Sequence, residues 1–289
     1  MLGGAKPFGF EVRFVHEPLR SRKHFLITPN HKVLYSVRNI IPSMKIKDIL
    51  RNIDHRSWPL PEGKWSYYQE WNNALFLHWN VDPNTLKKFI PSDLEIDLFE
   101  GEAWVSVVVF TMEKIRPRFL PAFDPISNFQ EINIRTYVQY KGKAGVYFLS
   151  IEAEKLLSCL IAENLSKLPY RYSTIKRNEN SIISKNLKTG DYFGVKFEVG
   201  DKLVSKSNID IWLTERYALF QDYKHRINCY EIHHLEWPIS KVTTSDLQVK
   251  YSRFDELLNN FPALTRYSSG VKVIAWARNW QNCELNQEK

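Results

Sequence analysis

The sequence has few cysteines and few glycines for its length. Of its 289 residues, three are cysteines and eleven are glycines. Cys159, Cys229 and Cys283 show neither a CxxC nor a CxxxC spacing, which argues against a disulfide framework and favours a cytoplasmic location. The scarcity of glycine disfavours loops that wrap a nucleotide through backbone amides.

Several motifs of well-known function are also missing. The chain has no P-loop, no GxGxxG turn, no GxSxG nucleophile elbow and no HExxH motif, so we expect no nucleotide cofactor and no metal. It has no run of about 18 apolar residues, so we expect no transmembrane helix and no membrane partner. The N-terminus lacks the apolar segment and small-residue cleavage site of a secretory signal.

The positive charge is concentrated near the N-terminus. The formal net charge is +8, which by itself suggests nucleic acid or an anionic surface as a partner. Residues 1–43 hold seven basic and two acidic residues, whereas the rest of the chain holds 33 and 30. The near-neutral body argues against nucleic-acid binding. Residues 1–43 show no sustained period, and two interpretations stay open: a flexible basic leader, or a stretch upstream of a natural start at Met44.

Beyond Met44 the pattern is mostly that of strands, and it predicts a single mainly β (α+β) domain over residues 44–289. A turn at residues 142–145 separates two of these strands and predicts antiparallel pairing. Predicted helices cover residues 45–52, 84–89, 154–168 and 254–261. Predicted strands cover residues 74–79, 94–98, 103–110, 132–140, 146–151, 192–199, 209–220, 227–232, 242–251 and 271–278.

Arg135 is the first candidate for a functional residue. Along residues 132–140 apolar side chains alternate with polar ones, and Arg135 lies on the polar face with Asn133 and Tyr137. An arginine there is either solvated or turned into the interior, where it needs a carboxylate partner. A guanidinium also suits a substrate carboxylate, because it donates two parallel hydrogen bonds.

Three further candidates follow apolar segments. Glu215 comes after the apolar residues 209–213. It either lies in solvent where the chain leaves the predicted strand, or points into the same interior as Arg135. His233 and His234 are adjacent on a strand, so their side chains point to opposite faces. Either one of them reaches a cavity, where an imidazole exchanges protons near neutral pH, or both make surface hydrogen bonds.

Seven segments in order resemble those of the YqjF-type bacterial proteins, an uncharacterised branch of the acetoacetate decarboxylase-like superfamily. The resemblance extends over roughly residues 44–280 and favours Met44 as the natural start. It implies a large, strongly curved antiparallel sheet closing into a cone-like barrel, with a few peripheral helices and a ligand cavity inside. The segments are residues 55–61, 75–82, 131–138, 145–151, 168–170, 213–217 and 232–238.

The resemblance also identifies a departure at Tyr170. In the decarboxylase, two adjacent lysines follow a proline after a helix, and one forms a Schiff base with the substrate. Here the corresponding residues after Pro169 are Tyr170 and Arg171, and a tyrosine has no amine from which to form an imine. The resemblance therefore implies a pocket without Schiff-base chemistry. Its candidate catalytic residues are Tyr170, Glu215, His233 and His234, and its candidate ligand-binding residues are Asn133, Arg135, Arg171 and Tyr217.

Two functions remain in competition. The first is a protein that binds a small carboxylate or carbonyl compound, either without turnover or with lyase- or hydrolase-like acid–base chemistry. The alternative is a non-catalytic regulatory or interaction module with a vestigial cavity. Neither needs a cofactor, and the sequence leaves the oligomeric state open, a homo-oligomer included.

Overall fold

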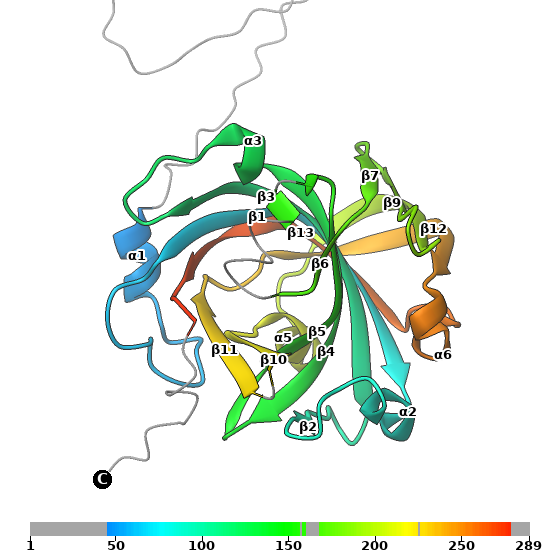
Figure 1. Cartoon of the computed structure of the whole chain (residues 1–289), viewed down its shortest axis with the longest axis horizontal. Coiled ribbons are helices and arrows are strands. Elements are labelled where there is room, and N and C mark those ends of the chain that lie inside the picture. Colours follow the sequence, from blue (N-terminus) through cyan, green and yellow to red (C-terminus); the bar gives the residue numbers. More distant parts are fainter. Residues whose placement is uncertain (1–44, 157, 160–167, 225, 279–289) are drawn as a thin grey trace, which may run out of the picture. The chain divides into compact units, whose positions relative to one another are not determined.

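The computed structural model describes residues 45–156, 158–159, 168–224 and 226–278. The predicted leader at residues 1–43 and most of the predicted helix at residues 154–168 lie outside this range. The described part is built mainly from strands (Figure 1). None of its helices has the length and hydropathy that crossing a membrane requires.

Seven strands form a closed ring, and each pairs with the next. All neighbours are antiparallel except β5 and β10, where Leu219 lies opposite Val146 in a parallel pair. The predicted hairpin is confirmed, because β4 and β5 pair antiparallel, but its turn is shorter than predicted and consists of residues 141 and 142. The ring runs β1 (Tyr67–Val81), β3 (Ala103–Pro117), β4 (Phe129–Tyr140), β5 (Lys143–Ala153), β10 (Ala218–Tyr223), β11 (Arg226–His233) and β13 (Leu264–Ala275), and β13 pairs again with β1.

The parallel contact between β5 and β10 requires a residue without a side chain. A Cβ at Gly145 would lie 2.5 Å from the carbonyl oxygen of Ala218 and 2.7 Å from the Phe220 ring. Both distances are well inside van der Waals contact, so only glycine allows the two strands this approach.

A second layer of strands covers one side of the ring. The sheet continues from β13 into β12 (Ile239–Lys250), β9 (Tyr192–Lys202), β8 (Ser181–Lys185) and β7 (Thr174–Arg177). This layer lies beside β3, β4 and β5 (Figure 1). Two short strands complete the sheet: β2 (Glu95–Ile96) pairs with β4, and β6 (Tyr170–Tyr172) runs parallel to β5.

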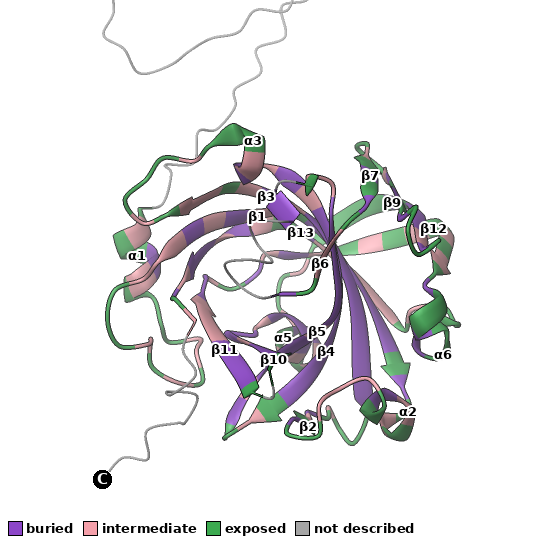
Figure 2. Cartoon of the chain, viewed as in Figure 1, coloured by how far each residue is buried: buried purple, intermediate pink, exposed green. Residues whose placement is uncertain are grey.

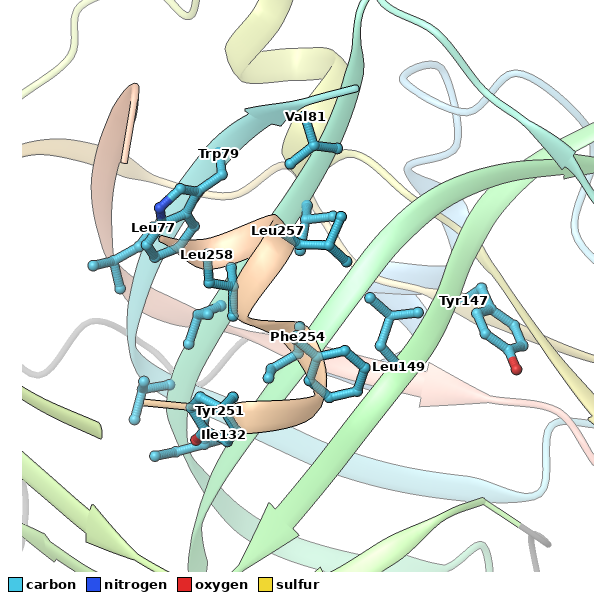
Figure 3. Close-up of a cluster of buried hydrophobic side chains, with 14 of the residues drawn as sticks. Leu77, Trp79, Val81, Ile132, Tyr147, Leu149, Tyr251, Phe254, Leu257 and Leu258 are labelled. Carbon is cyan, nitrogen blue, oxygen red and sulfur yellow. The ribbon is translucent and has the colours of Figure 1, made fainter. Parts of the chain in front are cut away.

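The largest apolar core fills the space between the ring and the second layer. Leu77 and Trp79 of β1 pack there with Phe254, Leu257 and Leu258 (Figure 3). The last three come from η1 (Ser252–Phe254) and α6 (Asp255–Leu258). Burial is nearly continuous along β3, β4 and β5 (Figure 2), as expected for strands covered on both faces.

The predicted helices at residues 45–52, 84–89 and 254–261 correspond to α1 (Ile46–Arg51), α2 (Pro83–Lys87) and the η1–α6 pair. The sequence explains the start of α2, because the Asp82 side chain accepts a 2.8 Å hydrogen bond from the Thr85 amide. A short α3 (Asp124–Ser127) precedes β4.

The predicted strand at residues 209–220 is wrong. Its first half forms the helix α5 (Asn208–Thr214), and β10 begins only at Ala218. A capping box between Ser207 and Asp210 starts this helix, because each side chain bonds the backbone amide of the other residue. The helix then packs its apolar side chains against Tyr137 and Val146 of the ring.

Candidate functional site

The candidate site lies on the inner face of the ring, where side chains of non-adjacent strands meet. Phe76 on β1 contacts Trp237, which follows β11, with ring centroids 5.1 Å apart. The guanidinium carbon of Arg135 on β4 lies 6.0 Å from the same Phe76 ring centroid. Because β3 separates β1 from β4, these contacts place all three side chains inside the ring.

Arg135 is buried there without a counter-charge. Arg135 is 8% exposed, and its Nη2 donates a 3.3 Å hydrogen bond to the carbonyl oxygen of Leu213. Its Nε has no hydrogen-bond partner. Among the described residues no carboxylate forms an ion pair with it, so this part of the chain does not supply the partner that an interior arginine was expected to need.

Two neighbouring arginines do have carboxylate partners. Arg216 Nη1 lies 2.5 Å from Asp97 Oδ2, and Arg266 Nε lies 2.7 Å from Asp210 Oδ1. The interior therefore compensates two of these three cations and leaves Arg135 as the centre of an uncompensated positive charge. A small anion in this position would gain a bidentate, poorly solvated partner.

A carboxyl group without a cation lies on the same face of β4. Glu131 accepts a 2.9 Å hydrogen bond from the Tyr170 hydroxyl and a 3.3 Å hydrogen bond from Asn133 Nδ2. Burial raises the pKa of Glu131 to about 7, and burial together with Glu131 raises the pKa of Tyr170 well above its ordinary value. A carboxyl that titrates near neutral pH suits general acid–base chemistry.

A third polar group forms a chain of hydrogen bonds across the strands. His78 Nδ1 lies 2.6 Å from Ser106 Oγ, which lies 2.7 Å from the Tyr137 hydroxyl. The Tyr137 hydroxyl donates a 3.1 Å hydrogen bond to the carbonyl oxygen of Leu213, which also accepts from Arg135. The three residues that form this hydrogen-bond chain, His78, Ser106 and Tyr137, are completely buried.

Glu215 lies inside the ring but already has several partners. Its Oε1 accepts from Lys206 Nζ at 2.7 Å and from the Trp237 amide at 3.0 Å, and its Oε2 accepts from the Tyr217 hydroxyl at 2.7 Å. Burial opposes ionisation of Glu215, yet the charges and hydrogen bonds of His234, Lys206 and Tyr217 hold its pKa below the ordinary value. Glu215 is therefore a structural anion more than a proton carrier.

The two adjacent histidines make different hydrogen bonds but share one aromatic neighbour. His233 is the last residue of β11 and His234 lies just beyond it, so the expectation that both are on a strand holds only for His233, and both rings lie near Tyr217. His233 Nε2 donates a 2.8 Å hydrogen bond to the carbonyl oxygen of Ile49 in α1. The His234 ring packs 4.9 Å from Tyr217 and 5.6 Å from Trp237, measured between centroids. Burial lowers the pKa of both histidines to about 4, so both are neutral at physiological pH.

Arg171 is not brought to this site. Because it follows Tyr170 in β6, its side chain leaves the opposite face of the strand. It donates a hydrogen bond to Ser150 Oγ and lies 3.8 Å from Asp191 Oδ2. Of the residues proposed from the sequence, Asn133, Arg135 and Tyr170 share the inner surface with Glu215, Tyr217 and His234. His233 bonds Ile49, although its ring also lies 6.3 Å from that of Tyr217, and Arg171 has its partners elsewhere.

Sequence reasoning missed Glu131, His78 and Ser106. Each interrupts a strongly apolar strand, and each is at most 3% exposed. For Glu131 a signal was present, because it precedes Asn133 and Arg135 at the strand period of two and so shares their face. The other two carried no distinguishing pattern within their strands.

Comparison with known proteins agrees with this architecture. Residues 68–272 match the family DUF2071, described as an uncharacterized conserved protein. The uncharacterized protein YqjF of Bacillus subtilis (strain 168) is 38% identical over 237 residues, which cover 76% of this chain and 95% of that protein. The resemblance seen in the sequence is thereby confirmed.

Solved structures show the fold at lower identity. An acetoacetate decarboxylase-like enzyme from Sphingomonas wittichii RW1 is 15% identical, with a TM-score of 0.52 over 75% of this chain and 94% of that one. The enduracididine biosynthesis enzyme MppR, in complex with pyruvate, is 9% identical, with a TM-score of 0.51 over 76% and 91%. The chain therefore belongs to the DUF2071 family of uncharacterized conserved proteins and has an acetoacetate decarboxylase-like fold.

Proposed function

We propose that this protein binds a small carboxylate or carbonyl compound inside the ring and acts on it by acid–base chemistry. The observation that carries the proposal is the buried guanidinium of Arg135, which has no carboxylate partner in the part of the chain that the structure describes, while Arg216 and Arg266 each have one. An unpaired buried cation is costly to the protein alone. A ligand carboxylate would remove that cost.

The solved neighbours add support at the level of the ligand class. The MppR structure holds pyruvate, a small oxo acid, in a protein of similar fold. In this chain the carboxylate of such a compound would be bound by Arg135, through the Nε that has no hydrogen-bond partner.

In this proposal Glu131 and Tyr170 carry out the proton transfer. Their hydrogen bond of 2.9 Å joins a carboxyl whose pKa is near 7 to a hydroxyl whose pKa is far higher. Glu131 therefore accepts or donates the proton at neutral pH, and Tyr170 holds its carboxyl in place. Asn133 holds the second carboxyl oxygen through its 3.3 Å hydrogen bond.

A Schiff base is not part of this proposal. Tyr170 has no amine, and the interior lysine Lys206 lies 2.7 Å from Glu215 Oε1 and 3.1 Å from Glu236 Oε1. A lysine nitrogen held in ion pairs with two carboxylates is not free to attack a carbonyl carbon. Borohydride reduction in the presence of pyruvate should therefore leave the mass of the protein unchanged, and a covalent adduct on any lysine would contradict this part of the proposal.

Binding can be tested by isothermal titration and thermal shift with a panel of oxo and hydroxy acids. At least one acid should stabilise the wild-type chain, and Arg135→Gln should remove that effect. Arg51→Gln, at an exposed position at the end of α1, serves as the matched control and should bind like wild type. If no acid binds, or if Arg135→Gln binds equally well, the proposal fails, and the non-catalytic module becomes the better interpretation.

A further inference from the structure

The hydrogen-bond chain from His78 to Leu213 has a fixed direction. A carbonyl oxygen can only accept a hydrogen bond, so the Tyr137 hydroxyl donates its single proton to the carbonyl oxygen of Leu213. The Tyr137 hydroxyl therefore accepts a hydrogen bond from Ser106, and this bond uses the single hydroxyl proton of Ser106. Ser106 Oγ can therefore only accept from His78, which places the imidazole proton on Nδ1.

The opposite nitrogen of His78 is consequently a bare acceptor. His78 Nε2 is buried, and no group of the described residues bonds to it. Burial, reinforced by the charges of Arg135 and Arg266, lowers the pKa of His78 to about 3, so the ring does not gain a second proton at neutral pH. A buried acceptor without a donor is costly, which suggests that a bound molecule supplies the donor.

His78 Nε2 and Arg135 belong to the same part of the interior. His78 is paired in register with Ser106, and Ser106 with Arg135, so the three residues form one row across β1, β3 and β4. Strands in a sheet are about 4.8 Å apart, so the row spans roughly 10 Å between backbones. Both side chains also contact Phe76, whose ring centroid lies 6.0 Å from the His78 ring and 6.0 Å from the Arg135 guanidinium.

We propose that the ligand is a hydroxy acid, whose carboxylate binds Arg135 and whose hydroxyl donates its proton to His78 Nε2. An oxo acid of the same skeleton has a carbonyl oxygen where the hydroxyl would be, and two acceptors then face each other. This inference rests on the proposed function, because it presupposes that Arg135 binds the carboxylate. It goes further by assigning a second contact, which selects between two oxidation levels of the ligand.

The preference can be measured with matched pairs of acids on the full-length protein. Lactate is compared with pyruvate, 2-hydroxyglutarate with 2-oxoglutarate, and 3-hydroxybutyrate with acetoacetate, by isothermal titration. We expect the hydroxy acid of at least one pair to bind tenfold or more tightly than its oxo partner, because the unpaired acceptor penalises the latter. His78→Phe keeps an aromatic ring beside Phe76 and should reduce the preference to about equal binding.

A second variant tests the direction of the hydrogen-bond chain. Tyr137→Phe frees the Ser106 proton, which can then be donated to His78 Nδ1, so that the imidazole proton moves to Nε2. The preference for the hydroxy acid should then fall by tenfold or more and can reverse, because Nε2–H donates to a carbonyl. Tyr147→Phe is the matched control, since the Tyr147 hydroxyl bonds Asp222 on the outer side of the ring, and it should retain the wild-type preference.

The tautomer itself is observable without any ligand. Nitrogen-15 resonances of the His78 ring should show a protonated Nδ1 and an unprotonated Nε2 in the wild-type chain, and the opposite pattern would overturn the inference. Equal binding of hydroxy and oxo acids, lost in Arg135→Gln, would overturn this inference and leave the proposed function standing. Binding of no acid at all would overturn both.

Discussion

The Tyr170 hydroxyl donates a 2.9 Å hydrogen bond to Glu131 Oε2, where a Schiff-base lysine would otherwise be expected from the family resemblance. The tyrosine faces a buried carboxyl that has no ion pair among the described residues. Burial raises the pKa of that carboxyl to about 7. Under the proposed function, this pair would exchange protons with the ligand, whereas a lysine at the same position would act as a nucleophile.

The pH dependence of stability should reveal Glu131. Its pKa is about 7 in the folded state against an ordinary value of 4.5, so between these values the folded chain keeps a proton that the unfolded chain releases. Stability from this group is complete below pH 4.5 and is lost as the pH rises to 7, by about 3 kcal/mol in total. Urea unfolding should show that Glu131→Gln, which stays neutral, gains stability relative to wild type across this window.

Other groups titrate in the same pH range, but the wild type and Glu131→Gln have them in common. The difference between the two plots of stability against pH therefore isolates the contribution of Glu131. The difference should grow from about pH 5 to pH 7 and then level off as the carboxyl becomes fully ionised. Parallel profiles over the whole range would show that Glu131 has an ordinary pKa.

Arg135→Met and Arg216→Met should differ clearly in their effect on the stability of the ligand-free protein. No carboxylate of the described residues pairs with Arg135, so its removal should leave the free energy of unfolding unchanged or raise it by about 1–3 kcal/mol. Arg216→Met leaves the buried Asp97 without its 2.5 Å ion pair and should cost about 3–5 kcal/mol. Urea unfolding at neutral pH measures both, and a loss for Arg135→Met as large as that for Arg216→Met would show that Arg135 is compensated within the protein.

Gly145→Ala should disturb the closure of the ring. The added methyl would lie 2.5 Å from the Ala218 carbonyl oxygen, a backbone atom that cannot move without separating β5 from β10. The expected cost is about 1–3 kcal/mol or more in urea unfolding. At Gly200 the nearest atom to the same methyl is 3.5 Å away, so Gly200→Ala is the control and should be neutral or slightly stabilising. Equal effects of the two substitutions would contradict the assigned role of Gly145.

Phe254→Ala should test the core between the ring and the second layer. The side chain is 1% exposed and belongs to the largest apolar cluster (Figure 3), so its truncation should cost about 3–5 kcal/mol. Phe261, seven positions further on, is 84% exposed, and Phe261→Ala should change the free energy of unfolding by less than about 0.5 kcal/mol. A midpoint of thermal unfolding that moves equally for both variants would argue against this packing.

The strands of the ring were largely predictable, whereas their closure was not. Apolar and polar residues alternate in β4, and a turn follows it, so the local pattern predicted the antiparallel pair with β5. The parallel contact between β5 and β10 joins residues about 70 positions apart, and no local pattern reports such a pairing. The short strands β6, β7 and β8 were missed because three to five residues are too few to establish a period.

The error at α5 has a specific physical cause. Ile209, Ile211 and Leu213 alternate with other residues and so imitate a strand, whereas in the structure a capping box between Ser207 and Asp210 starts a helix. The helix matters for the candidate site, because the carbonyl oxygen of Leu213 accepts hydrogen bonds from both Arg135 and Tyr137. An extended segment would not place that oxygen at the end of the hydrogen-bond chain.

The polar residues of the site were predictable only in part. Arg135 was found because a charged residue within an alternating strand is conspicuous, and Tyr170 was found through the resemblance. His78 and Ser106 lie in apolar strands, and their importance depends on the register that sets β1 against β3 and β3 against β4. Register is a property of the pairing between strands, so a single strand does not disclose it.

The pairing of β1 with β13 also has a consequence for how the protein is made. Tyr67 lies opposite Ala275, so roughly 200 residues must be synthesised between the two partners. At ordinary translation rates of about 5–20 residues per second, the open edge of β1 waits roughly 10–40 s for its neighbour. During that interval the nascent chain presents an unpaired strand edge to other chains. The ring therefore closes only when its last strand has been made, at the end of synthesis of this domain.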